Sequence, residues 1–151
     1  MQMSCIKLRS MSSANAIAQL QNQGHRITTA RRVLLEIFDA SRRPLNAQDI
    51  NQALTRQGVK VNTSTIYREL QFLQKQGLVN PLQLSTNQLY YESAQLPHHH
   101  HLVCDSCGSI DPVECHEVES PLRRLETRVN QTGFTITNHT LEFYGTCAGC
   151  R

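Results

Sequence analysis

The chain has 151 residues, with 15 Lys and Arg against 12 Asp and Glu and a formal net charge of +3. That length allows one ordinary domain or two small ones, and the mild positive charge suits a nucleic-acid partner without requiring one. No apolar run is long enough to span a bilayer, and residues 1–13 lack the apolar segment of a secretory signal. We therefore expect a cytoplasmic protein with no membrane partner, in which the cysteines stay reduced and bind metal.

The first part of the chain has the apolar spacing of amphipathic helices. One helix follows Thr28 or Thr29, either of which can cap it. Its buried face recurs at i, i+3, i+4, i+7 and i+8: Ala30, Val33, Leu34, Ile37 and Phe38. Asn46 with Asp49 predicts a capping box ahead of the next helix. The apolar stripe of that helix is Ala47, Ile50 and Leu54.

The following helix has a polar face suited to DNA. We expect it to begin at Asn62 or Thr63 and to end at Gly77. Its buried stripe is Ile66, Leu70 and Leu73. The other side carries hydroxyl, amide and basic groups, with further charge from a preceding arginine: Ser64, Tyr67, Arg68, Gln71, Lys75 and Arg26. These side chains can contact phosphates and base edges. The alternative is that this side of the helix is only exposed to solvent and does not contact DNA.

A hairpin is expected next, from Leu82 to Glu92, with its turn at residues 85–87. Helices followed by a hairpin have the order of a winged helix-turn-helix. The predicted fold class is α+β with four segments: a flexible tail (1–13), a winged-helix DNA-binding domain (14–92), a hinge (93–97) and a metal-binding α/β domain (98–151).

The composition changes after Pro97, where histidines and cysteines become frequent. Short strands are expected around residues 102–103 and 110–113. Ser120 followed by Pro121 predicts a helix cap with Pro at the first helical position. Residues 135–144 are rich in Thr, Ile and aromatics, which predicts a strand.

Two Cys-x-x-Cys pairs give the strongest chemical signal. Cys104 with Cys107 and Cys147 with Cys150 supply four thiolates, the set that a tetrahedral structural Zn²⁺ needs. The two-residue spacing lets both sulfurs of a pair face one ion. A redox pair or buried free thiols is the alternative, but a thioredoxin-like motif uses one such pair, ahead of a helix. We predict a structural zinc site held by these four cysteines.

Four consecutive histidines stand just before Cys104. In an extended segment alternate residues face opposite sides, so His99 and His101 share one side and His98 and His100 share the other. One short strand is therefore expected to serve two metal sites. Imidazole binds zinc, iron and manganese alike, so these ligands do not select the ion. A solvated polar loop is the alternative.

Further side chains are candidates to complete these sites: Glu92 at the end of the hairpin, Glu117, Glu119 and His139. A single carboxylate is more often just a solvated charge. His139 shares strand parity with Leu141 and Phe143, so a satisfied core histidine is its alternative. The residues alone leave these choices open.

In this order, the features resemble the ferric uptake regulator (Fur) family over residues 14–151. The matching segments are Arg26-Ile-Thr-Thr-Ala-Arg-Arg, Ala47-Gln-Asp-Ile, Ser64-Thr-Ile-Tyr-Arg-Glu-Leu, Tyr91-Glu92, His98 to Gly108, Asn138-His-Thr-Leu-Glu-Phe-Tyr-Gly and Cys147-Ala-Gly-Cys150. The resemblance implies a transcriptional repressor rather than an enzyme, with a winged-helix domain and an α/β dimerisation domain. It also implies metal-enabled binding of a homodimer to a palindromic A/T-rich operator, with no small-molecule substrate.

The resemblance also implies roles for single residues. The four cysteines match the family's structural zinc site. Its inter-domain sensing site is matched by Glu92, His99 and His101. Its second site, in the dimerisation domain, is matched by His98, His100, an acidic residue near Glu119, and His139. Its DNA contacts are matched by Tyr67 and Arg68 in the recognition helix and by Arg26 near the minor groove.

Two features of the chain bear on the regulatory metal. Iron and peroxide sensors of the family carry a histidine just before the helix that opens at Ala47, and here that position is Pro44. The segment from His139 to Gly145 and the cysteine at position 115 are similar to the zinc uptake regulator branch. The prediction is therefore regulation by Zn²⁺, with Fe²⁺ or Mn²⁺ as the alternatives.

Two other functions compete with a repressor. A zinc hydrolase would use His and Glu beside a metal to activate water. The sequence has no His-Glu-x-x-His, and no His-x-Glu ahead of the cysteines as in deaminases. A metal store or chaperone would leave the helix-turn-helix half without a role. The sequence therefore favours the repressor.

Overall fold

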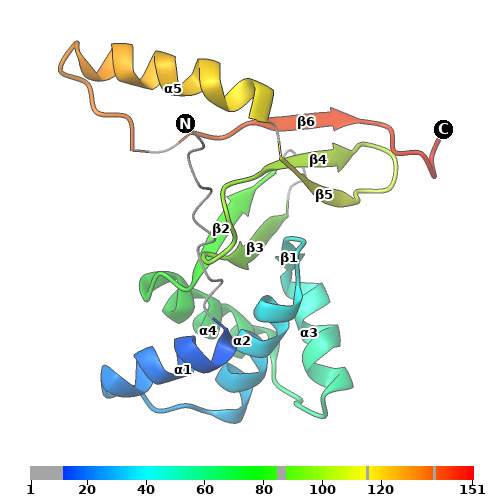
Figure 1. Ribbon diagram of the computed structural model, residues 1–151. Coiled ribbons are helices and arrows are strands. Elements are labelled where there is room, and N and C mark those ends of the chain that lie inside the picture. The colour runs from blue at the N-terminus through cyan, green and yellow to red at the C-terminus, as the bar shows by residue number, and fades with distance from the viewer. Residues whose placement is uncertain (1–11, 85–87, 115, 138) are drawn as a thin grey trace. The chain divides into compact units, whose positions relative to one another are not determined.

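The computed structural model describes residues 12–84, 88–114, 116–137 and 139–151. The chain divides into two compact units, Met1–Pro97 and His98–Arg151. In Figure 1 the first unit runs from blue to green and the second from green to red. None of the helices in the described ranges is long and apolar enough to cross a membrane.

The described part of the N-terminal unit has four helices: α1 (Ser13–Asn22), α2 (Thr29–Ala40), α3 (Ala47–Arg56) and α4 (Thr63–Lys75). Thr28 caps α2 by accepting a hydrogen bond from the Arg31 backbone N–H. Asn46 and Asp49 form the predicted capping box of α3. Asn62 caps α4, and Gly77, with a φ of 67°, takes the left-handed conformation just beyond its end. The predicted helix starts and stops in this region are confirmed.

The core of this unit is formed by one apolar face from each helix. The fully buried side chains are Leu20, Leu34, Ile50, Leu54, Ile66, Leu70, Leu73 and Val79. Burying one such side chain contributes about 1.5–3 kcal/mol to folding. Three of these residues, Ile66, Leu70 and Leu73, belong to α4 and are the predicted stripe. Their burial anchors one side of α4 and leaves the other side in solvent.

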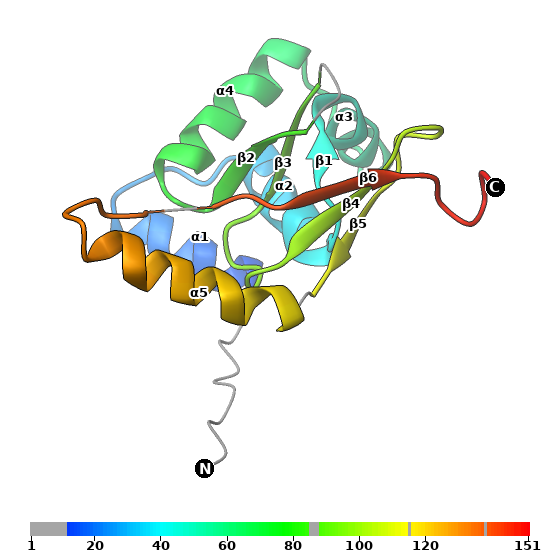
Figure 2. The ribbon, with the colours of Figure 1, turned by 90° about the horizontal axis from the view of Figure 1, so that it is seen from above.

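A small sheet accompanies these helices (Figure 2). Its strands are β1 (Leu45–Asn46), β2 (Val79–Gln83) and β3 (Leu89–Ser93), in the order β1-β3-β2 with antiparallel pairing. The hairpin begins at Val79, three residues earlier than predicted, and its predicted turn at residues 85–87 lies outside the described residues. Strand β1 was not predicted, because a strand of two residues has no periodicity and is defined only by its pairing with β3.

Among its described residues, the C-terminal unit has a second sheet and one long helix (Figure 1). The strands are β4 (His100–Cys104), β5 (Ile110–Val113) and β6 (Glu142–Gly145), in the order β5-β4-β6. β5 is antiparallel to β4, and β6 is parallel to it. The helix α5 spans His116–Asn130. Helices and sheets in this order give the predicted α+β fold class, with a helical domain and its small sheet followed by an α/β domain.

Two predicted boundaries in this unit are wrong. The helix does not begin at Ser120 and Pro121, because Pro121 lies inside α5. That proline removes a single backbone bond near the helix start, which α5 tolerates. The strand predicted over 135–144 is also too long, since only Glu142, Phe143 and Tyr144 of its described residues lie in a strand. Strand formation requires a pairing partner, and of the predicted segment only residues 142–144 pair with β4.

Candidate functional site

The topology of the second sheet brings the two Cys-x-x-Cys pairs to one end. Cys104 closes β4, and parallel pairing sets it opposite Gly145, two residues before Cys147. The four sulfur atoms, of Cys104, Cys107, Cys147 and Cys150, all lie within 4.8 Å of one another, and all four thiols are free. The sulfurs of Cys107 and Cys147 are 3.8 Å apart. A tetrahedral zinc with bonds of about 2.3 Å requires sulfur separations of about 3.8 Å, so this cluster fits a structural zinc site.

The electrostatics of the cluster also favour a cation. The backbone N–H of Cys147 donates to the Cys104 sulfur at 3.3 Å. That bond, with further help from Cys107, lowers the pKa of Cys104 to about 6. Contacts with the Cys147 and Cys107 sulfurs raise the pKa of Cys150 to about 12. Thiols this close cannot all ionise together, unless a cation balances their charge.

A second cluster forms where β4 and α5 face each other. The Glu119 carboxylate oxygen lies 2.9 Å from Nε2 of His98 and 2.8 Å from Nε2 of His100. His139 completes the group, and the four ligand atoms lie within 4.8 Å of one another. The hydrogen bond with His100 holds the pKa of Glu119 below its ordinary value. Of the two carboxylates that the sequence left open, Glu119 lies in this cluster, while Glu117 is exposed.

The orientation of His139 indicates a ligand. Its Nδ1 lies 3.0 Å from the Glu126 carboxylate, while its Nε2 is buried without a hydrogen-bond partner. A buried nitrogen of this kind is costly unless something binds it. Metal-ligating histidines commonly use the other ring nitrogen to contact a carboxylate, as His139 does. The donor set and this unpartnered atom fit a divalent metal.

Sequence reasoning missed Glu126. It lies seven residues after Glu119 in α5, and a separation of two turns puts both carboxylates on one face of the helix. The seven-residue separation from Glu119 could have identified Glu126 as a residue on the same helix face. Nothing in the sequence, however, indicated that His139 lies against α5.

The remaining histidines of the run lie on the other side of β4. The rings of His99 and His101 are 4.8 Å apart, and His101 is buried. Glu92 belongs to β3 in the N-terminal unit, where it is also buried, with 8% of its surface exposed. A carboxylate or imidazole is rarely buried unless it is paired or bound to an ion.

The DNA candidates share the solvent-facing side of α4. These side chains are all exposed: Ser64, Tyr67, Arg68, Gln71 and Lys75. Tyr67 is 45% exposed, which is unusual for a large aromatic side chain. Arg26 is exposed in the loop between α1 and α2. This face offers hydroxyl, amide and cationic donors to an anionic partner.

The family model of the ferric uptake regulators matches residues 22–144, most of the chain. The chain belongs to the ferric uptake regulator family. It is 31% identical over 143 residues to a ferric uptake regulation protein of Neisseria meningitidis, covering 93% of this chain and 96% of that protein. It is 40% identical over 118 residues to a zinc uptake regulation protein of Mycobacterium tuberculosis, covering 78% of this chain and 86% of that protein.

Solved structures of this family share the fold. The Vibrio cholerae ferric uptake regulator aligns with a TM-score of 0.75 and 25% identity over 87% of this chain and 99% of its own. The Helicobacter pylori ferric uptake regulator aligns with a TM-score of 0.76 and 21% identity over 99% of this chain and 97% of its own. This Fur-family chain is thus a metal-responsive transcription regulator and not an enzyme, from a family that binds operator DNA as dimers.

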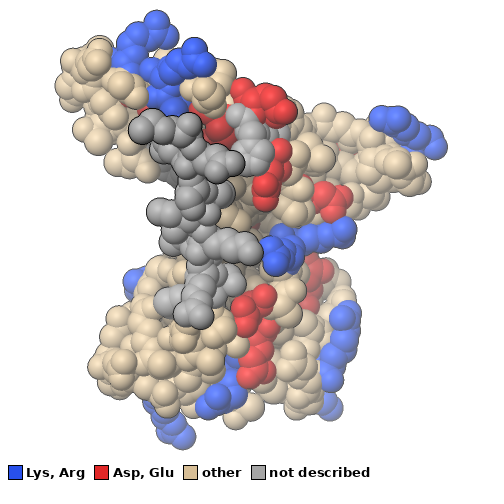
Figure 3. All heavy atoms as spheres, in the orientation of Figure 1, with Lys and Arg blue, Asp and Glu red and all other residues tan. Residues whose placement is uncertain are grey.

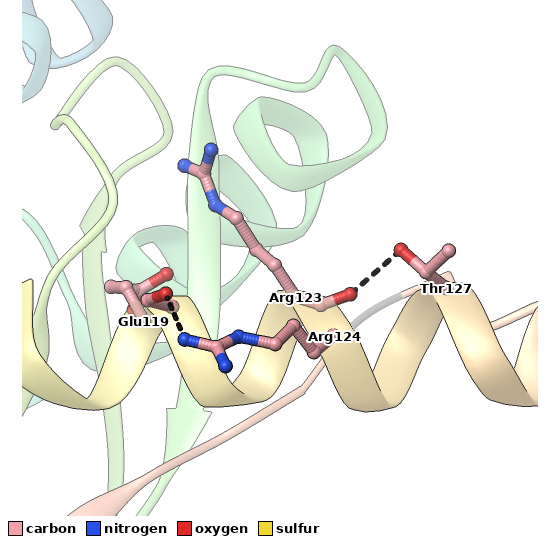
Figure 4. Close-up of a pocket in the computed structure, with 5 residues that line it drawn as sticks. Glu119, Arg123, Arg124 and Thr127 are labelled. Carbon is pink, nitrogen blue, oxygen red and sulfur yellow. Dashed lines mark hydrogen bonds between the residues drawn. The ribbon is translucent and has the colours of Figure 1, made fainter.

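One further hollow of this Fur-family chain lies on α5 and is lined by Glu119, Ser120, Arg123, Arg124 and Thr127. In Figure 4, Arg123 points away from the helix, while Arg124 lies along it. Arg124 donates to the Ser120 hydroxyl at 3.2 Å, and Thr127 donates to the Arg123 carbonyl at 2.8 Å. Figure 3 shows basic side chains gathered over α5. These bonds stay within one helix, as expected of a solvated polar face.

Proposed function

We propose that the chain is a homodimeric repressor of metal-uptake genes that binds its operator when zinc occupies a regulatory site formed by Glu92, His99 and His101. The observation that carries this proposal is the division of the four histidines between the two sides of the chain at the start of β4. His98 and His100 join Glu119 and His139 on one side, which leaves His99 and His101 paired on the other. Two histidines need a further ligand, and Glu92 is a buried carboxylate in the other unit.

The three ligand sets have different roles in this proposal. The four cysteines hold a structural zinc, because a site of four thiolates is closed to further ligands. The set of His98, His100, Glu119 and His139 supports the C-terminal unit. We assign regulation to Glu92, His99 and His101. A metal ion bound jointly by Glu92 of the N-terminal unit and by two histidines of the C-terminal unit would restrict how the two units move. The Helicobacter pylori relative is described as having three functional metal binding sites, which supports three sites here.

The homodimer is supported by apolar surface on the C-terminal unit. The stripe of α5, which comprises Val118, Leu122, Leu125 and Val129, has no fully buried member. Leu125 is 46% exposed. Leu102 and Phe143 are register partners on β4 and β6 and are also exposed. Exposed apolar side chains on both the helix and the sheet favour a protein interface, and a second copy of the chain is the partner that a family of dimers requires.

Zinc is favoured over iron by the position before β1. Leu45 pairs with Tyr91 in antiparallel register, so Pro44, one residue earlier, lies across from Glu92. Pro44 is buried and has no ligand atom. An imidazole at this position, as in the iron sensors that the chain resembles, would lie beside Glu92. The identity to the zinc uptake regulation protein, 40%, against 31% to the ferric one, agrees with zinc.

Metal-switched DNA binding is the direct test. We expect the dimer to bind a palindromic A/T-rich operator at least about tenfold more tightly with Zn²⁺ than with Fe²⁺ or Mn²⁺, each buffered at its cellular free level. Buffering is essential, because zinc outcompetes both ions at most nitrogen and oxygen sites when they are compared at equal concentration. Fluorescence anisotropy of labelled operator under anaerobic conditions measures the three affinities. Activation by Fe²⁺ alone would make the protein an iron regulator.

Two variants control this experiment. His101→Ala is expected to remain a dimer but to lose the metal response, whereas His100→Ala, on the other side of β4, retains most of it. Pro44→His adds an imidazole beside Glu92 and is expected to raise the response to Fe²⁺. A chain that binds metal but no DNA in any of these conditions would be a metal store, and metal-dependent hydrolysis would indicate an enzyme.

A separate prediction concerns Glu126. Glu126→Ala is expected to lower the metal affinity of the His98, His100, Glu119 and His139 site about 10- to 100-fold, because the carboxylate orients His139 and increases its basicity. Glu126→Gln retains an acceptor oxygen and is expected to lose less. Competition with a chromogenic chelator measures the affinities. Glu117→Ala is the control, as an exposed carboxylate of the same helix. Equal affinities for Glu126→Ala and Glu117→Ala would contradict the assigned role.

A further inference from the structure

Arg31, at the start of α2, joins two segments of the N-terminal unit. Its Nε and Nη2 donate to the two carboxylate oxygens of Glu69 in α4, at 2.8 and 3.2 Å. Its Nη1 donates to the backbone carbonyl of Arg26 at 2.6 Å. One guanidinium therefore links the loop before α2 to the helix that presents the polar face.

The plane of this guanidinium is held by an aromatic ring. The central carbon of Arg31 lies 3.8 Å from the centre of the Phe72 ring, a cation–π contact. The His25 ring meets Phe72 edge to face, with centres 5.0 Å apart. Loop residues 25 and 26 are thus both anchored near α4, one through Phe72 and the other through Arg31.

Burial makes this linkage stronger than a surface ion pair. The side chains of Arg31 and Glu69 are only 12% and 15% exposed. Sheltered charges are screened less by salt than exposed ones, and a two-bond arginine–carboxylate contact is geometrically specific. The backbone N–H of Arg31 also donates to the Thr28 hydroxyl at 3.2 Å. Arg31 therefore binds the loop through its backbone N–H as well as through its guanidinium.

We propose that Arg31 is a positioning residue for DNA recognition: it fixes the Arg26 loop relative to α4, so that Arg26 and the α4 face contact one operator together. This inference rests on the proposed function, in which both segments contact DNA. Arg31 commits its donors to Glu69 and Arg26, so its role is to order the loop before binding. Ordering the loop in advance removes an entropy penalty from association.

A coupling experiment tests this role. Arg31→Lys keeps the charge, but an ammonium cannot form the two-bond contact with Glu69 while also donating to the Arg26 carbonyl. We expect operator affinity to fall about tenfold, with zinc content and dimer mass near those of the parent. Arg26→Ala is expected to weaken the parent clearly but to add little loss to Arg31→Lys. A merely structural role would not produce that non-additivity.

Matched variants keep the test decisive. Arg32→Lys makes the same change at the next residue, whose exposed side chain has no hydrogen bond or ion pair within the part of the chain that the structure describes. It is expected to bind like the parent. Glu69→Gln removes the charge from the other end of the contact while retaining an acceptor, and is expected to show the same non-additivity with Arg26→Ala. It provides the test if Arg31→Lys does not fold.

Two results would overturn the proposal. One is parent-like operator affinity of Arg31→Lys and Glu69→Gln. The other is that Arg26→Ala changes operator affinity by the same factor in the parent and in these variants. That result includes the case in which Arg26→Ala has no effect in either background. Arg68→Ala, measured in parallel, reports on α4 separately. If Arg68→Ala weakens binding while Arg31→Lys does not, only the positioning role fails; if Arg68→Ala also binds like the parent, the proposed DNA interface fails.

Discussion

Cys147→Ser is expected to release the zinc of the four-cysteine cluster and to unfold the C-terminal unit, which also dissociates the dimer. The unit spans only His98–Arg151, and a domain of this size buries too little apolar surface to fold without further support. A structural zinc bound by thiolates contributes about 10 kcal/mol or more to folding in small zinc domains. Loss of one of four ligands therefore removes a large part of the stability.

Three measurements check this result together: bound zinc by elemental analysis, helicity by circular dichroism and mass by analytical ultracentrifugation. Cys5→Ser is the control, because it makes the same chemical change outside the Cys-x-x-Cys pairs, and it is expected to match the parent. Zinc removal from the parent by a strong chelator should reproduce the Cys147→Ser state. A zinc-free Cys147→Ser chain with full helicity and dimeric mass would show that the cluster is not structural.

Sequence patterns predicted the N-terminal unit well because its signals are local. Capping by Thr28 and Asn46 depends on residues three positions apart, and the buried stripe of α4 depends on a period of 3.6. The C-terminal unit depends on long-range pairing. The limits of β6 are fixed by β4, about 40 positions earlier in the chain, and no local signal indicates where that pairing stops.

The candidate sites show the same contrast. The candidate ligand pairs could be recognised because their spacing itself sets their geometry. Two residues separate the cysteines of each Cys-x-x-Cys pair, and one residue separates the histidines that share a side of the extended segment at β4. The choice between Glu117 and Glu119 could not, since it depends on how α5 faces β4. In the sequence, Arg31 was noted only as part of the segment that begins at Arg26 and resembles the family, and no role was assigned to it. Its contact with Glu69, 38 positions away, shows that its charge is used inside the unit.

Arg68→Ala is expected to weaken operator binding about 5- to 150-fold without changing zinc content or dimer mass. Arg68 is exposed in the second turn of α4, where a recognition helix reaches base edges and phosphates. A two-bond contact between arginine and guanine provides about 1–3 kcal/mol of discrimination, which corresponds to that range. Its one hydrogen bond to a described residue, to the Thr65 hydroxyl at 3.3 Å, is long, so the guanidinium can turn toward DNA.

Three further variants distinguish the kinds of contact along the same face. Tyr67→Phe removes the hydroxyl, and Tyr67→Ala also removes apolar contact with thymine methyl groups. Lys75 lies two turns beyond Arg68 and is expected to reach a phosphate at most. Lys75→Ala should therefore weaken operator and unrelated DNA equally and reduce the salt dependence of log K by about one unit.

The decisive measurement is anisotropy with saturating zinc at several salt concentrations, on the operator and on a scrambled sequence. A recognition helix requires that Arg68→Ala and Tyr67→Ala lose affinity for the operator more than for the scrambled duplex. If both variants bind the operator like the parent, the polar face of α4 is only solvated. The chain would then contact DNA through another surface, and the roles proposed for Arg26 and Arg31 beside α4 would fail with it.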